Sequence, residues 1–347
     1  MYQRPPRIDV DHPSTVNETS NQDLSRYDSR HHQALRTNYA VPTPLASPRN
    51  NPFEAQNHDS FDNEQGSTDA PNLPWKERVR CFTWTWFTMT MATGQMANVL
   101  YAVPYRFPGL YAIGVTFFLL NICLFIFNVV MITLRFRLYP STFWASISHP
   151  SESLFVPASV ISFGTILLNI TQYGTQQGRT GEWLDEVMVV MFWIYAALAM
   201  SFTCGIYLVM WSTQVFTLAT LTPVWIFPCY PLLVIAPHAA VLGNRVPGSR
   251  ALDILIGGFT LQGVGFMVSL MVYAAFLYRL MTIKLPQDPL RPGMFVSVGP
   301  SGFTIAGIIN MGQALPKSIP PDFMSVGPLA GTITMIMANW VGIWLWG

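Results

Sequence analysis

Charged residues are scarce in this chain. Lys, Arg, Asp and Glu together make up 11% of its 347 residues, whereas soluble domains contain about 25%. Hydrophobic residues make up 51% and aromatic residues 14%. Because residues 1–75 are strongly polar, the remainder is more apolar than the mean hydropathy of +0.33 indicates. The shortage of charge excludes a water-soluble protein and predicts one that is embedded in a lipid bilayer.

Motifs for catalysis, metal binding and nucleic-acid binding are also missing. The chain has no HExxH, no G-x-S-x-G and no glycine-rich phosphate loop with its lysine. The four cysteines form neither a CxxC pair nor a Cys/His cluster, so we expect small buried hydrophobic residues rather than disulfides or metal ligands. The net charge of +1 comes without a basic stripe. We therefore expect no enzyme, no metal, no cofactor and no nucleic-acid partner.

Residues 1–75 are rich in Pro, Ser, Asn, Asp and Gln and contain few aliphatic side chains. Such a segment cannot bury enough apolar surface to offset the entropy lost on ordering, so we expect a disordered tail. It also lacks the apolar core of a signal peptide. We expect this tail to be cytosolic and residues 76–347 to form a transmembrane transporter domain.

Eight apolar segments follow, and most approach the roughly 20 residues that a spanning helix needs. They predict an all-α, multi-pass membrane protein built of helical hairpins. The expected segments are Cys81–Val103, Leu110–Leu134, Leu154–Tyr173, Val187–Trp211, Val224–Leu242, Leu252–Leu280, Val298–Leu315 and a last one from Val326 to the final residue.

Odd-numbered and even-numbered segments differ in character. The odd ones contain Gly, Pro, Thr, Asn and Gln, whereas the even ones are closer to plain hydrophobic spans. Polar or Pro-broken backbone at membrane depth is tolerated only where it faces protein or a water-filled cavity. We therefore expect the odd helices to line a central pore and the even helices to surround them. Close packing of small residues would explain the glycines, but it explains the alternation less well.

The distribution of Lys and Arg over the loops favours a cytosolic N-terminus. With that orientation, the loop that holds His149 and Glu152 is cytosolic. The basic residues at the cytosolic loop ends would then be Lys76, Arg78, Arg80, Arg135, Arg137, Arg279, Lys284 and Arg291. Fewer basic residues would lie outside, namely Arg106, Arg179, Arg245, Arg250 and Lys317.

Three ionisable residues deserve a hypothesis. His149 and Glu152 lie at the expected mouth of the third segment, where they would form a proton-responsive or anion-filtering vestibule. For Glu152 we favour helix capping, since a carboxylate is stabilised at a helix N-terminus. His238 lies inside the fifth segment and is a functional candidate for that reason. A carbonyl freed by Pro237 could equally well satisfy it.

An anion path does not need a buried cation, because helix N-termini and freed backbone N–H groups supply partial positive charge. Prolines near the start or middle of the third, fifth and seventh segments create such breaks. Aromatic side chains in the same segments are candidates for a hydrophobic constriction, although each one alone is more often a packing residue. They are Phe155, Phe163, Trp225, Phe227 and Phe303.

Four blocks together resemble one family. They are WFTMTMATGQMANVLYAVPY (86–105), HPSESLFVPASVISFGTILLNITQYG (149–174), TPVWIFPCYPLLVIAP (222–237) and RPGMFVSVGPSGFT (291–304). They are similar to the tellurite-resistance/dicarboxylate transporter family, whose members include fungal malic acid transport proteins, sulfite efflux pumps and plant slow anion channels. The last block is closest to the malic acid transport branch, and the resemblance covers residues 76–347.

The resemblance implies ten helices in five hairpins, with odd helices around a pore, an aromatic gate and often a trimer. The family's inner-helix motif positions fall on Thr93, Gly94, His149, Glu152, Phe155, Pro157, Pro223, Trp225, Pro228, Gly299, Pro300 and Phe303. Of these, together with the aromatic Phe163, we take as the candidate substrate path Thr93, Gly94, Phe155, Pro157, Trp225, Pro228, Gly299, Pro300 and Phe303. The run Ala92-Thr93-Gly94 departs from the Gly-Thr-Gly common in the family. The eighth segment also reaches the last residue, so we expect the domain to be incomplete at its C-terminus and to lack the gate aromatic of the ninth helix. We expect the 347-residue chain alone to transport poorly.

The function that the resemblance implies is transport of small organic anions, four-carbon dicarboxylates such as malate first, with or without protons. We expect a multi-pass protein of the plasma membrane, with a homotrimer as its candidate assembly. A sulfite efflux pump or an anion channel is the alternative within this class. A scaffold or receptor-like membrane fragment that does not transport is the alternative of another class.

Overall fold

The computed structural model describes residues 74–174, 182–214, 217–246, 248–286, 288–319 and 326–346, and within these ranges it contains helices and no strands. The tail expected over residues 1–75 lies almost entirely outside the described residues. The α-helices are α2 (Trp75–Arg80), α3 (Phe87–Ala102), α4 (Leu110–Leu138), α5 (Ser141–Ser148), α6 (Pro157–Tyr173), α7 (Glu182–Thr213), α8 (Tyr230–Leu233), α9 (Ile235–Gly243), α10 (Ser249–Ile283), α11 (Val298–Ser318) and α12 (Gly327–Trp346). Short 3₁₀ helices are η1 (Trp84–Trp86), η2 (Ser153–Phe155), η3 (Leu218–Thr220), η4 (Pro223–Cys229) and η5 (Asp288–Ser297).

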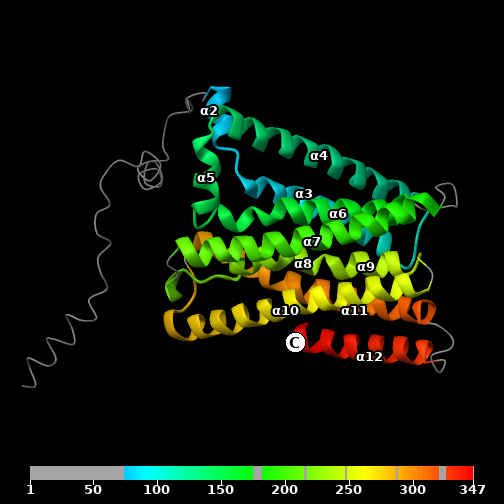
Figure 1. Ribbon diagram of the computed structural model, residues 1–347. Helices are drawn as coiled ribbons and strands as arrows, with labels where there is room; N and C mark the ends of the chain where they lie inside the picture. Colours follow the sequence, from blue (N-terminus) through cyan, green and yellow to red (C-terminus); the bar gives the residue numbers. More distant parts are fainter. Residues whose placement is uncertain are drawn as a thin grey trace, which may run out of the picture. The chain divides into compact units, whose positions relative to one another are not determined.

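Six of the expected spans are helical stretches long and apolar enough to cross a membrane. They are Leu110–Leu138, Ser153–Tyr173, Trp183–Thr213, Pro223–Gly243, Ser249–Ile283 and Leu290–Ser318. The all-α, multi-pass architecture is therefore confirmed. The first span is shorter than expected, because Thr83 is extended and the chain enters α3 through η1. In Figure 1 the long helices lie alongside one another and α5 lies across their end beside α2.

Burial separates inner from outer helices. We compare the most apolar 18-residue stretch of each span. In the third span 78% of that stretch is buried inside the protein and in the fifth span 94%, against 17% for α4. This difference agrees with the expected inner position of the third and fifth segments. The seventh departs from it, since only 28% of its most apolar stretch is buried. One face of α11 forms the wall of a cavity instead of packing against another helix.

The fifth span is broken into η4, α8 and α9, because Pro228, Pro231 and Pro237 interrupt its backbone hydrogen bonds. Three hydroxyls of α7 satisfy the carbonyls around the break. Tyr195 donates to the carbonyl of Pro231 at 2.9 Å, and Thr203 donates to that of Pro228 at 2.9 Å.

Tyr207 completes this set by donating to the carbonyl of Trp225 at 3.0 Å. Carbonyl oxygens along this broken segment thus accept hydrogen bonds from side chains of a neighbouring helix, as a broken spanning segment requires.

The cysteine prediction is wrong for three of the four residues. Cys229 is buried, but Cys81, Cys123 and Cys204 are exposed. Cys123 and Cys204 lie on α4 and α7, whose surfaces are largely uncovered by protein. An apolar helix surface in lipid accommodates a thiol as readily as a protein core does, so the composition of a segment does not fix its burial.

We predict that Tyr195→Phe destabilises the protein by about 1–3 kcal/mol, the cost of leaving the buried carbonyl of Pro231 without its donor. Thermal unfolding of the purified protein in detergent measures the change. The control is Tyr278→Phe, the same substitution at a side chain that is 59% exposed. Equal unfolding temperatures for the two variants would show that the hydroxyl of Tyr195 does not support the break.

Candidate functional site

Two cavities lie among the helices that the sequence places inside. The first, called here the α3/α11 cavity, has a volume of about 700 Å³. It is lined from α3 by Gln95, Asn98, Val99, Tyr101 and Ala102, from α6 by Gln172, from α9 by Pro237, Ala240 and Val241, from α11 by Val298, Gly299, Gly302, Phe303, Ala306, Asn310 and Gln313, and also by Arg106 and Asn244.

Helical periodicity explains how these residues reach one space. On α11 they recur at intervals of one to four positions from Val298 to Gln313, which defines one face of the helix. Small residues on that face, such as Gly302 and Ala306, leave the space open. The first turn of α11 also borders the cavity at Val298 and Gly299, and the N-terminus of a helix carries partial positive charge.

Neutral amides and one cation give the α3/α11 cavity its polarity. Among the described residues that line it, Arg106 alone is charged, and none is acidic. The Arg106 side chain donates from Nη2 to the carbonyl of Tyr101 at 2.9 Å, and its guanidinium carbon lies 5.1 Å from the centre of the Tyr101 ring. An absence of carboxylates together with a fixed guanidinium favours anions over cations.

Three amides of this cavity are joined in a chain. Gln172 donates from Nε2 to Oδ1 of Asn98 at 2.5 Å, and Asn98 donates from Nδ2 to Oε1 of Gln95 at 3.2 Å. The chain crosses from α6 to α3 and ties the two helices together.

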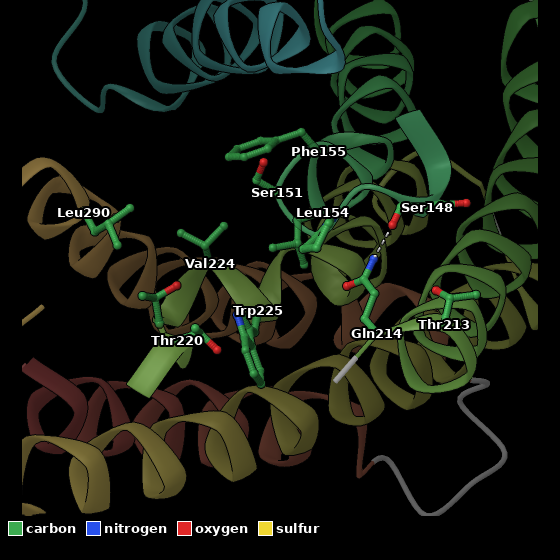
Figure 2. Close-up of a pocket in the computed structure, with 13 residues that line it drawn as sticks. Ser148, Ser151, Leu154, Phe155, Thr213, Gln214, Thr220, Val224, Trp225 and Leu290 are labelled. Atoms are coloured by element: carbon green, nitrogen blue, oxygen red, sulfur yellow. Dashed lines mark hydrogen bonds between the residues drawn. The ribbon is translucent and has the colours of Figure 1, made fainter. Parts of the chain in front are cut away.

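The second cavity, called here the α5/η4 cavity, has a volume of about 620 Å³ and lies at the end of the bundle where α5 crosses it. Its lining combines polar, uncharged side chains with apolar ones. Figure 2 shows Gln214, which donates to the carbonyl of Ser148 at 3.1 Å, on the same wall as Thr213. The lining residues are Ser148, Pro150, Ser151, Leu154, Phe155, Thr213, Gln214, Thr220, Thr222, Val224, Trp225, Leu290 and Gly293.

A chain of aromatic rings runs from one cavity to the other. Phe155 lines the α5/η4 cavity and lies 5.1 Å from Phe227, measured between ring centres. Phe227 stacks on Tyr230 at 5.0 Å, and Tyr230 meets Phe303 edge-on at 6.3 Å. Phe303 lines the α3/α11 cavity. The Tyr230 hydroxyl donates to the carbonyl of Val296, which fixes the ring in place.

Four of the ten predicted path residues line a cavity. Phe155 and Trp225 line the α5/η4 cavity, and Gly299 and Phe303 line the α3/α11 cavity. The other six, which line neither cavity, are Thr93, Gly94, Pro157, Phe163, Pro228 and Pro300.

Those six serve packing or backbone geometry. Gly94 lies where α3 crosses α6, since a Cβ there would stand 2.6 Å from Oγ1 of Thr165. Thr93 donates to the carbonyl of Met89 within its own helix at 2.9 Å. Pro157 and Pro300 are buried near the first turns of α6 and α11. Phe163 packs at 6.4 Å from Tyr195, and Pro228 lies within η4.

The capping role expected for Glu152 is wrong. Glu152 precedes η2 without a side-chain capping bond and instead forms an ion pair with Arg135 of α4. Both side chains are largely covered, with 8% of Arg135 and 15% of Glu152 exposed. Sequence reasoning favoured the cap because it is local, whereas the ion pair joins residues on two different helical hairpins.

The two histidines lie outside the cavity linings. His149 is exposed between Ser148 and Pro150, and its Nδ1 is 3.0 Å from Oγ of Ser151. His238 is fully buried, with Nε2 3.3 Å from Oγ1 of Thr171. The Thr171 hydroxyl, rather than a carbonyl freed by Pro237, is therefore the contact of Nε2. No group of three or more His, Cys, Asp or Glu in the described ranges could hold a metal ion.

Sequence reasoning missed most of the α3/α11 cavity. Its amide-bearing residues are Gln95, Asn98, Gln172, Asn244, Asn310 and Gln313. The available signal was spacing, because Gln95 and Asn98 recur on one face of α3 and Asn310 and Gln313 on one face of α11.

Comparison with known proteins agrees with this architecture. The family model described as voltage-dependent anion channel, SLAC1, matches residues 81–347. The chain belongs to the SLAC1 family. No solved structure gives a significant match.

Several curated relatives of this SLAC1-family chain come from fungi. The malic acid transport protein of Schizosaccharomyces pombe is 31% identical over 278 residues, which cover 80% of this chain and 63% of that protein. A putative malic acid transport protein of the same yeast is 27% identical, with 80% and 64% covered. The sulfite efflux pump SSU1 of Trichophyton rubrum is 26% identical, with 76% and 69% covered. The chain thus spans slightly less than two thirds of the two malic acid transport proteins.

We predict that Glu152→Gln destabilises the protein by about 3–5 kcal/mol, because it leaves the guanidinium of Arg135 buried without its counter-charge. The free energy of unfolding measures the change. Glu186→Gln is the matched control. It breaks the pair with Arg250, in which both side chains are more than half exposed, and we expect no measurable change. A small loss for Glu152→Gln would show that the pair with Arg135 contributes little to stability.

Proposed function

We propose that this SLAC1-family protein carries small organic anions across a membrane, four-carbon dicarboxylates such as malate first. The observation that carries the proposal is the α3/α11 cavity. It has space for a small molecule, it is lined by amides, and Arg106 is the charged residue among its described lining. The malic acid transport proteins among the relatives support malate as the first substrate to test.

The proposed path joins the two cavities through the aromatic chain. Rings of Phe155, Phe227, Tyr230 and Phe303 lie between the α5/η4 cavity and the α3/α11 cavity. A hydrophobic constriction of this kind blocks a hydrated anion until the rings move apart. Partial positive charge from the first turn of α11 and from Arg106 would stabilise an anion that has reached the α3/α11 cavity.

The proposed membrane is the plasma membrane, with the N-terminus in the cytosol. Support for this orientation comes from the basic residues at one end of the bundle, among them Arg80 of α2 and Arg135 and Arg137 of α4. The α5/η4 cavity would then open to the cytosol and the α3/α11 cavity to the outside.

Sulfite efflux is the second candidate. The SSU1 pumps among the relatives favour it, and the α3/α11 cavity is large enough for the smaller oxyanion. Both substrates need the same positive polarity, so the geometry alone supports sulfite as well as malate.

The test is binding and flux with the purified protein. In lipid nanodiscs we expect saturable binding of labelled malate that succinate displaces more effectively than sulfite. In reconstituted vesicles we expect any malate flux to follow the same order of competition. Displacement by sulfite but not by succinate would replace malate with sulfite as the substrate. Absence of saturable binding for all three anions would contradict the proposal and favour a scaffold that does not transport.

A further inference from the structure

The amide chain in the wall of the α3/α11 cavity has a direction. Gln172 gives its N–H to Asn98, and Asn98 gives its N–H to Gln95. Asn98 and Gln95 therefore each accept through the side-chain oxygen. At the Gln95 end the chain finishes with an amide nitrogen, and at the Gln172 end it finishes with an amide oxygen.

The two ends of the chain are unsatisfied. Nε2 of Gln95 and Oε1 of Gln172 are buried atoms with no hydrogen-bond partner among the described residues. Buried polar groups in native proteins are nearly always paired, and an unpaired one calls for an explanation such as a ligand. Gln95 and Gln172 both line the α3/α11 cavity, where a ligand would be available.

Direction matters because an isolated glutamine shows no preference between presenting its N–H₂ and presenting its oxygen. Here Oε1 of Gln95 is occupied by Nδ2 of Asn98. Turning the Gln95 amide over would bring two N–H₂ groups face to face and lose that bond. With the three amides in this arrangement, the chain presents a donor, rather than an acceptor, at the Gln95 end. Aligned hydrogen bonds also polarise one another, which strengthens the last donor.

We propose that Nε2 of Gln95 is the group that binds the carboxylate of the transported anion, and that Asn98 and Gln172 are positioning residues that fix its orientation. This inference rests on the proposed function, because it assigns a role within the same path. It identifies the ligand chemistry as an oxyanion that accepts an N–H bond while Arg106 supplies the net charge of the site.

The first test replaces the donor. In Gln95→Glu the side chain keeps its size and still accepts from Asn98, but a carboxylate oxygen replaces Nε2. We expect the affinity for labelled malate in nanodiscs to fall at least tenfold at pH 7. Gln95→Met removes the donor without adding charge, and we expect a several-fold fall. Wild-type affinity in Gln95→Met would overturn the proposal.

A pH profile separates a lost donor from a structural defect. A protonated carboxyl group donates a hydrogen bond, and an unperturbed Glu titrates at about 4.3. The ratio of the Gln95→Glu affinity to the wild-type affinity at each pH cancels the titration of malate itself. We expect this ratio to rise toward one as the pH falls from 7 to 4.5. A ratio that stays constant over this range would contradict the proposal.

The second test reverses the chain. In Asn98→Asp both oxygens at residue 98 are acceptors. Gln172 already donates to that residue, so Gln95 alone must turn its N–H₂ group toward it. The oxygen of Gln95 then faces the anion, and we expect at least a tenfold loss of malate affinity. The matched control is Asn310→Asp, which adds the same charge to the lining of the same cavity without touching the chain. We expect a smaller loss there.

The outcomes distinguish this inference from the function on which it rests. If the wild-type protein binds no malate, succinate or sulfite, the proposed function fails. If it binds malate and Asn310→Asp weakens binding as much as Asn98→Asp, added charge alone explains the loss and the role of the amide chain is wrong. Unfolding temperatures within about 2 °C of wild type confirm that the variants are folded.

Discussion

The structure depends on how the backbone carbonyls of a broken helix find hydrogen-bond donors inside a membrane. The segment from Pro223 to Gly243 is the most deeply buried span, and its prolines free backbone carbonyls. Hydroxyls of Tyr195, Thr203 and Tyr207 on α7 take up the carbonyls near the break. Without these donors the three carbonyls would lose their side-chain partners at membrane depth, which is costly. The even-numbered helix α7, whose outer surface is apolar, therefore stabilises the broken backbone of the inner segment.

The break has a functional consequence. It places Phe227 and Tyr230 on two short helical pieces, η4 and α8, so that their rings stack and connect Phe155 with Phe303. These ring contacts form a chain from the lining of one cavity to the lining of the other. On the α3/α11 side the polarity comes from amides, a helix N-terminus and one guanidinium. An anion can be stabilised there without an ammonium or guanidinium group buried in the core, which would be costly at membrane depth.

The sequence predicted the architecture better than the site. Helical spans are set by length and composition, and the inner position of α6 and of the fifth span follows from their Pro, Gly and polar residues. The cavity lining depends on how each helix is rotated about its axis, which composition does not determine. Gly94 and Phe163 therefore lie outside both cavity linings, while Gln95 and Gln172, which line the α3/α11 cavity, were not chosen as path residues because a neutral amide in a helix is equally typical of helix packing. The pair between Arg135 and Glu152 joins two hairpins and could not be inferred from local pattern.

The central claim is that the α3/α11 cavity is a water-filled space that attracts anions. It is tested most directly by the rate at which charged thiol reagents modify a cysteine in its wall. Ala306→Cys provides that cysteine in a protein whose native cysteines are replaced, and Leu119→Cys, on the exposed surface of α4, is the control. The account predicts that an anionic methanethiosulfonate modifies residue 306 at least several times faster than a cationic one, and that residue 119 reacts with neither. Equal rates at residue 306, or faster reaction with the cation, would contradict it.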